Sequence, residues 1–218
     1  MAETPDPEHH VASDPSEEAS DDQGSGRGDQ LTRSQAARRE RVIRAAIDLA
    51  ATGGYDAVQM RDVASHGNVA LGTIYRYFTS KDHLLAAVQV QWITDLEGRI
   101  RLRPPKGDST ADRMVDILRR ATRAMEKEPD LTAAVVTALA SPDPAVAGCK
   151  DEMDQVMGRI QAMAFPVDFD PEVQARVMRA LGFVWFSLLL AWVNGWEGID
   201  ASGDELISAA HLMLDQFG

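Results

Sequence analysis

The side chains that most often carry catalysis are few and scattered in this sequence. His66, His83 and His211 lie far apart, and Cys149 is the only cysteine. None of them has a carboxylate at the spacing of a metal site or a catalytic triad. The sequence has no H-E-x-x-H motif, no glycine-rich phosphate loop and no G-x-S-x-G motif. It therefore predicts no catalytic centre, no metal site and no cofactor.

A different chemistry is indicated between residues 61 and 81, where arginine, hydroxyl-bearing and small side chains lie close together. A guanidinium can bind O6 and N7 of guanine at the same time, which suits Arg61 to base recognition. Tyrosine and threonine hydroxyls and the Lys81 ammonium suit phosphate oxygens, which fix register rather than sequence. Small side chains allow a helix to approach the groove closely. The predicted DNA-contacting residues are Arg61, Leu71, Gly72, Thr73, Tyr75, Arg76, Tyr77 and Lys81.

The distribution of charge supports selective rather than bulk binding of nucleic acid. The chain carries a formal net charge of -12, made up of -8 over residues 1–30, +3 over residues 31–85 and -7 over the remainder. A protein that coats DNA without sequence preference needs an extended basic surface. Only one short stretch of this chain is basic, so the sequence favours a sequence-selective reader.

Short helices are expected to position the DNA-contacting residues. Apolar spacing of three and four predicts a helix from Gln35 to a left-handed cap at Gly53-Gly54, then helices over 60–66 and 70–77. A tight turn at Gly67 would join the last two as a helix-turn-helix. Ala64, Val69 and Ile74 would share its small core with Phe78. Arg33, Arg38, Arg39 and Arg41 suit either a flanking phosphate or a solvated face.

The rest of the chain is also expected to be helical. Ser80 is the predicted N-cap of a helix to about 101, and Ser109 with Asp112 forms a capping box for the next helix, which Pro129 would end. Further helices are predicted over 131–140, 145–165, 171–196 and 204–217. The fold class is therefore all-α, with about nine helices. The predicted domains are a disordered acidic tail (1–32), a helix-turn-helix head (33–85) and an effector-binding and dimerisation bundle (86–218).

Residues 54–85 resemble the DNA-binding domain of the TetR family of bacterial transcriptional repressors. The resemblance rests on Arg61 and Ala64 after Gly54, on Gly-Thr-Ile-Tyr-Arg-Tyr-Phe at 72–78, and on Lys81 and Leu84. It implies a homodimer that binds a palindromic double-stranded operator, with half-sites about 34 to 36 Å apart. The last two helices are the interface that the family uses. The resemblance predicts Val184, Leu188, Ala191, Leu206, Ala209, Ala210 and Met213 there.

A narrower resemblance, to the KstR type of actinobacterial repressors of sterol catabolism, rests on residues 57–61, 72–78, 123–132 and 184–192. It implies an acyl-CoA effector, and a lipid or steroid fits as well. Mixed methionine and aromatic side chains line pockets for flexible apolar ligands, although each alone is more often core. The predicted effector-binding residues are Met114, Met125, Met163, Trp185, Leu189 and Trp192.

Two expectations concern the cellular setting. The N-terminus lacks the basic region and apolar run of a secretion signal, so a cytoplasmic protein is expected. The longest apolar run, 180–193, has 14 residues, fewer than the roughly 20 that cross a bilayer, so a buried helix is predicted there. A carrier of apolar ligands without DNA binding is the main alternative function, and Arg61→Ala and Lys81→Ala would then leave its activity unchanged.

Overall fold

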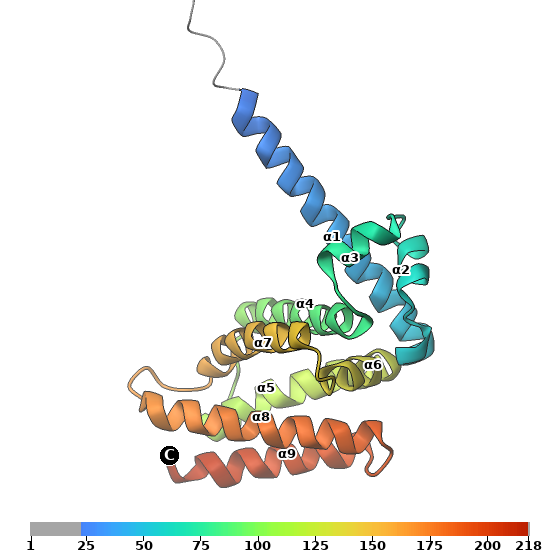
Figure 1. Cartoon of the computed structure of the whole chain (residues 1–218). Coiled ribbons are helices and arrows are strands. Elements are labelled where there is room, and N and C mark those ends of the chain that lie inside the picture. The colour runs from blue at the N-terminus through green and yellow to red at the C-terminus, as the bar shows by residue number, and fades with distance from the viewer. Residues whose placement is uncertain (1–22, 218) are drawn as a thin grey trace, which may run out of the picture. The chain divides into compact units, whose positions relative to one another are not determined.

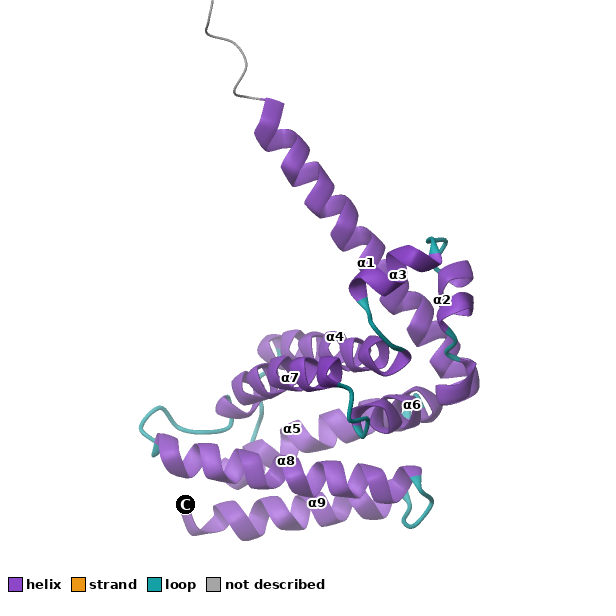
Figure 2. Ribbon diagram, viewed as in Figure 1, coloured by secondary structure: helices purple, strands orange, loops and turns teal. Residues whose placement is uncertain are grey.

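The computed structural model describes residues 23–217, with only the backbone for 23–32, Ile199 and Asp200. Contacts divide the chain into residues 1–37, with the first turns of α1, and residues 38–218, with the whole core described below. Over the described part the structure contains nine α-helices, one 3-10 helix and no strand, which confirms the all-α prediction (Figure 2).

Three helices form the head. They are α1 (Gln23–Ala57), α2 (Met60–His66) and α3 (Leu71–Tyr77). Because α1 begins at Gln23, it overlaps the segment expected to be a tail, and the rest of that segment, 1–22, lies outside the described residues. The predicted interruption at Gly53-Gly54 is confirmed, since Gly54 has φ 63°.

The turn between α2 and α3 differs from the expected glycine turn. Gly67 has φ -78°, and the left-handed residue is Asn68, with φ 49°. Asparagine tolerates this conformation better than most residues. Gly67 instead allows close approach, because a Cβ atom there would lie 3.1 Å from the Val63 carbonyl oxygen and 3.3 Å from that of Arg41.

The head has a compact apolar core. Val42 of α1, Val63 of α2, Ile74 of α3 and the following Phe78 are almost completely buried, and Val69 packs against them. Each short helix thus contributes one or two side chains to a shared centre, as the spacing of Ala64, Val69 and Ile74 predicts. The core roles expected for Ile74 and Phe78 are confirmed.

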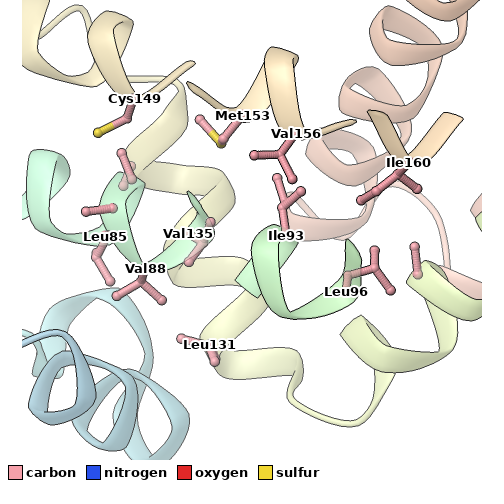
Figure 3. Close-up of a cluster of buried hydrophobic side chains, with 14 of the residues drawn as sticks. Leu85, Val88, Ile93, Leu96, Leu131, Val135, Cys149, Met153, Val156 and Ile160 are labelled. Carbon is pink, nitrogen blue, oxygen red and sulfur yellow. The ribbon is translucent and has the colours of Figure 1, made fainter. Parts of the chain in front are cut away.

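The bundle begins with α4 (Lys81–Leu102) and α5 (Thr110–Glu126). It continues with α6 (Pro129–Leu139), α7 (Pro144–Ala162), α8 (Pro171–Val193), α9 (Ile199–Leu214) and the 3-10 helix η1 (Asp215–Phe217). In Figure 1, α4 lies beside α7 while α8 and α9 run side by side. Apolar side chains of α4, α6 and α7 meet in one cluster that includes Leu85, Val135 and Met153 (Figure 3).

Helix ends follow their capping residues. The Ser80 cap and the Ser109 and Asp112 capping box are both formed as predicted. Pro129 does not end α5 but starts α6, because proline's fixed φ and missing N–H suit the first helical turn. Similarly, α9 begins at Ile199 rather than at residue 204, with Gly198 as its N-cap and Gly203 packed inside the helix against Thr122.

One ion cluster fastens α4 to α7. Glu97 of α4 is 7% exposed and accepts two hydrogen bonds of 2.9 Å from Arg159 of α7 and two from Arg101, of 2.7 and 3.1 Å. The Arg159 and Arg101 hydrogen bonds outweigh the effect of burial and lower the pKa of Glu97 to about 2. The carboxylate therefore stays charged although it is buried.

Candidate nucleic-acid interface and effector cavity

Helix α3, which carries most of the predicted DNA contacts and is called the predicted recognition helix below, is held in the head by one completely buried side chain. Ile74 has no exposed surface, whereas Gly72 and Arg76 are exposed and Tyr75 is 52% exposed. The predicted contacts on α3 therefore fall into two groups. Gly72, Tyr75 and Arg76 are open to a DNA groove, and Leu71, Thr73 and Tyr77 are half-buried.

The half-buried group is tied to the head itself. Leu71 and Tyr77 pack against the apolar core, and the Tyr77 ring lies 6.3 Å from that of Phe78. Their apolar bodies orient α3, and the Tyr77 hydroxyl is the part of that side chain suited to a phosphate oxygen. Leu71 is better placed as a packing residue than as a contact to a thymine methyl group.

Two free guanidinium groups make the head a candidate DNA interface. Arg61 at the start of α2 and Arg76 of α3 are both exposed, and neither forms an ion pair with the side chains described for residues 33–198 and 201–217. Such side chains keep their full donor capacity for phosphate or guanine. By contrast, Arg44 is paired with Glu40 at 2.9 Å, and the Arg39 guanidinium lies over the Phe78 ring at 5.5 Å. Arg38 and Arg41 are exposed.

Lys81 has a more structural position than the sequence suggests. Its Nζ donates to the Tyr55 carbonyl oxygen at 3.1 Å and lies 3.6 Å from the centre of the Tyr55 ring. The Tyr55 hydroxyl donates to Asp82 at 2.6 Å, and burial followed by this hydrogen bond raises the pKa of Tyr55 to about 12. Tyr55, a residue that sequence reasoning missed, thus fastens the end of α1 to the start of α4 with Lys81 and Asp82.

The predicted effector-binding residues do not converge on one cavity. Met114 and Met125 of α5 are buried, whereas Met163, Trp185, Leu189 and Trp192 are half-buried. Trp185, Leu189 and Trp192 share one face of α8 by their spacing. Met125 alone of the six lines a cavity of about 10 Å³, whose walls come from α4, α5, α6 and the turn after α5. The lining residues are Val88, Gln89, Trp92, Ala124, Met125, Glu128, Leu131, Thr132 and Val135.

This cavity has room for about one water molecule, so an effector of any size requires its walls to move. Sequence reasoning missed Val88, Trp92, Leu131 and Val135 because only the packing of α6 on α4 brings them together. A second hollow of about 310 Å³ is open at the surface and contains none of the predicted residues. It is lined by Pro166, Asp168, Phe169, Asp170, Val173 and Phe217.

The dimer-face prediction is wrong at two of its seven residues, Leu206 and Ala210. Leu206 and Ala210 are buried within the protomer, and Val184, Leu188, Ala209 and Met213 pack against the same core. Ala191 is half-buried, as those four are, so five of the seven predicted residues keep part of their surface on the outside of the protomer.

The apolar residues left outside lie on the opposite side of α8. Phe183 is 66% exposed, and Phe186, Leu190 and Val193, which follow it at spacings of three and four, are half-buried. Leu212 of α9 is 83% exposed and Trp196 in the turn before α9 is 75% exposed. We call Phe183, Phe186, Leu190, Val193, Trp196 and Leu212 the outer face. A patch of this kind marks an interaction site.

The prediction of a buried helix over 180–193 is therefore also wrong. Within the apolar window of α8 only 11% of the residues are buried, because one side of the helix has no neighbour. By length and composition α8 could cross a membrane. Together α6 and α7 also meet the criterion, although they are bent by 116° at their break. Such helices are weak evidence for a membrane span, since helices of water-soluble proteins meet the same criterion.

Among the described residues no three histidine, cysteine, aspartate or glutamate side chains gather in a possible metal site. His66 pairs with Asp48 at 3.1 Å and His211 with Asp215 at 3.1 Å, both at the surface. Cys149 is buried in α7, and burial raises the pKa of its thiol. A buried thiol of this kind is a packing residue.

Comparison with known proteins identifies two segments. Residues 42–88 match the family described as bacterial regulatory proteins of the tetR family. Residues 107–212 match the tetracyclin repressor-like C-terminal domain. The first segment covers the head and the start of α4, and the second covers most of the bundle. Both halves of the chain thus match parts of one kind of regulator.

Individual relatives agree with this result. The chain is 39% identical to the HTH-type transcriptional repressor KstR of Rhodococcus jostii over 87% of this chain and 88% of that protein. It is 35% identical to KstR of Mycolicibacterium smegmatis over 83% of this chain and 88% of that protein. Among solved structures, a TetR transcriptional regulator from Rhodococcus sp. RHA1 has a TM-score of 0.76 and 30% identity, covering 85% of this chain and 100% of that one.

A more distant structure shares the fold. Thermus thermophilus FadR, a TetR family transcriptional repressor in complex with lauroyl-CoA, has a TM-score of 0.61 and 20% identity. The match covers 79% of this chain and 92% of that one.

Proposed function

The chain belongs to the TetR family of DNA-binding transcriptional repressors, which are not enzymes, and we propose that it is a ligand-responsive regulator of this kind. It binds a palindromic operator as a homodimer in the cytoplasm, and a hydrophobic small molecule releases it. The observation that carries the proposal is the 39% identity to a KstR repressor across both the head and the bundle.

DNA binding is assigned to the exposed side of α2 and α3. Arg61 reads a guanine, Arg76 and the Tyr75 hydroxyl bind phosphate, and Gly72 allows the helix to approach the groove closely. Thr73 and Tyr77 add hydroxyl contacts to phosphates. Lys81 contributes positive charge and, through Tyr55, holds the start of α4 in place. The domain division keeps residues 33–85 as the reading head and 86–218 as the effector and dimerisation part.

The homodimer is assigned to the outer face rather than to the residues first predicted. On a single protomer the outer face is apolar and open to solvent, with three residues exposed and three half-buried, and two copies related by a two-fold axis would bury it. A palindromic operator requires this symmetry, because each head reads one half-site.

The effector is assigned to the space between α4, α5 and α6, where Met125 and the other lining residues surround the small cavity. Trp185, Leu189 and Trp192 supply a further half-covered apolar face on α8. An acyl-CoA is the favoured class, since a repressor of the same fold is known in complex with lauroyl-CoA. Other lipids and steroids share the apolar chemistry that this lining accepts.

A binding titration tests the proposal. The purified protein is titrated with the DNA upstream of its own gene and of the neighbouring genes, with scrambled DNA of the same composition as control, at one stated salt concentration. Palindrome-dependent binding is expected, followed by release when saturated and sterol-derived acyl-CoAs are added. If the protein binds no genomic fragment more tightly than scrambled DNA, the function as a repressor is contradicted.

A further inference from the structure

Two capping residues from different parts of the bundle bind each other. Ser80 caps α4, and its Oγ accepts a hydrogen bond of 3.0 Å from the His83 backbone N–H. Asp143 caps α7, and its Oδ1 accepts one of 2.9 Å from the Ala145 backbone N–H. The Ser80 hydroxyl then donates to Asp143 Oδ2 at 2.5 Å, across 63 positions of sequence. The first turns of two helices therefore share one hydrogen-bonded pair, which we call the double cap.

The carboxylate suits this position electrostatically. The N-terminus of a helix carries a partial positive charge, and Asp143 lies against two of them. The Ser80 hydrogen bond, followed by the Ala145 one, lowers the pKa of Asp143, so this side chain is charged at neutral pH. Hydrogen bonds to a charged group are stronger than neutral ones.

On one side the double cap adjoins the predicted recognition helix. Ser80 follows Phe78, the C-cap of α3, by two residues. The buried Phe78 ring meets the His83 ring edge-on at 5.5 Å, and the Thr79 N–H donates to His83 Nδ1 at 3.2 Å. These contacts fix the short segment between Tyr77 and the first turn of α4. A movement of Ser80 is therefore expected to move α3.

On the other side the double cap adjoins the cavity. Leu131, Thr132 and Val135 of α6 line it, and the chain runs from the end of α6 at Leu139 directly to Asp143. The opposite wall is α4 itself, through Val88 and Trp92 (Figure 3 labels Val88, Leu131 and Val135). The double cap thus joins the start of α4, which forms one wall of the cavity, to the segment that follows α6, which forms the opposite wall.

We propose that the Ser80 to Asp143 hydrogen bond is the contact through which an effector between α4 and α6 controls the predicted recognition helix. This inference rests on the proposed function. A cavity of about 10 Å³ in a close-packed interior expands only if its walls separate. In this proposal, separation of α6 from α4 draws Asp143 away from Ser80 through residues 140–142, so an enlarged cavity and an intact double cap exclude each other. Ser80 and Asp143 then act as positioning residues, through α3 and α6, and not by touching DNA or effector.

Measuring the Kd for both the effector and the operator separates a coupling role of the double cap from a merely structural one. If the double cap belongs only to the operator-binding state, its removal shifts the population toward the effector-binding state. Ser80→Ala is therefore expected to lower the Kd for the effector by up to about tenfold, the factor that corresponds to one hydrogen bond. The Kd for the operator should rise in the same variant. A variant that only destabilises the fold would bind both ligands more weakly, and that result would overturn the proposal.

Matched controls are available within the chain. Ser109→Ala removes an equivalent serine cap from α5, which does not adjoin the predicted recognition helix, and should change neither Kd. Ser80→Thr keeps the hydroxyl and should behave as wild type. Asp143→Asn should act in the direction of Ser80→Ala, whereas Asp170→Asn, at the N-cap of α8, should not.

The titrations use the full-length protein, its upstream operator fragment, and lauroyl-CoA as the effector probe. Hydrogen exchange with the operator alone gives a second readout that requires no effector. Operator binding should slow exchange at Ala145 and along the first turn of α7 in wild type, and this protection should be lost in Ser80→Ala. Equal protection in both proteins would overturn the double cap as the coupling contact while the proposed function stands. Failure of wild type to select any DNA would overturn the proposed function and the inference with it.

Discussion

The head and α8 differ in how much of their apolar surface is buried within one protomer. In the head, Val42, Val63, Ile74 and Phe78 are each almost completely buried within a short stretch of chain. In α8, which has the most continuous apolar sequence of the protein, only 11% of the apolar window is buried. The head core is complete within one protomer, whereas the proposed homodimer would cover the apolar surface that the bundle leaves exposed. The two regions should therefore respond to substitution in different ways.

The largest effect is expected in the core of the head. Phe78→Ala removes a buried ring next to the predicted recognition helix and should lower the free energy of unfolding by about 3 to 5 kcal/mol. Urea unfolding monitored by circular dichroism measures the change. The loss should not depend on protein concentration if the head is complete within one chain. A stability loss below about 1 kcal/mol would contradict the tight packing of Phe78.

A charge on the outer face should act on assembly instead. Phe183→Glu places a carboxylate at the exposed apolar side of α8 and should weaken the dimer by about 2 kcal/mol or more, roughly 30-fold in the dissociation constant. Sedimentation velocity over a range of concentrations measures this change. Val167→Glu, at an apolar residue in the loop before α8 with all of its surface exposed, is the matched control and should leave the dimer intact. Unchanged assembly of Phe183→Glu would place the interface elsewhere.

Within the head, base reading and phosphate binding should separate. Arg61→Ala is expected to cost about 1 to 3 kcal/mol and to relax base preference at one position of each half-site. Tyr77→Phe and Lys81→Ala should weaken all sites about equally. Competition titrations with single-base operator variants distinguish the two patterns. A uniform loss for Arg61→Ala would remove its base-reading role.

The smallest effect is expected when the pH is lowered, and it concerns the stability of the bundle. Because the pKa of Glu97 falls from 4.5 to about 2 on folding, its ionised form stabilises the protein. That contribution is present above pH 4.5 and is lost progressively between about pH 4.5 and pH 2. With the arginines half in solvent, it should amount to about 1 to 2 kcal/mol. The stability difference between wild type and Glu97→Gln should therefore shrink with falling pH. A stability difference that does not change with pH would show that the ion pair between Glu97 and Arg159 adds nothing to stability.

Sequence reasoning succeeds in the head because its signals are local. Ser80 caps its own helix, Gly54 ends one, and Ile74 is buried by spacing alone, so neighbouring residues determine each outcome. It fails where distant segments meet. Neither the Glu97 to Arg159 pair nor the cavity wall at Val135 has a local signature, because both depend on how α4 packs against α6 and α7.

The dimer prediction is wrong at Leu206 and Ala210 for a related physical reason. Periodicity shows that one side of α8 or α9 is apolar, but α8 is apolar almost all the way round. Only the packing of the bundle shows that Leu188 and Leu206 face inward while Phe183 faces out. The Lys81 contact to Tyr55 was missed in the same way, since a lysine suited to phosphate is equally suited to a carbonyl oxygen and an aromatic face.

The outer face also has a consequence for how the cell makes this protein. If the outer face is the interface of the proposed dimer, a newly synthesised protomer leaves Phe183, Leu212 and Trp196 in contact with water until a second copy arrives. Pairing is second order in concentration, so a very low rate of synthesis prolongs the time each chain spends single and vulnerable to chaperones and proteases. Copy number then sets a threshold for the amount of active protein. Halving expression near that threshold would remove more than half of the operator-binding species.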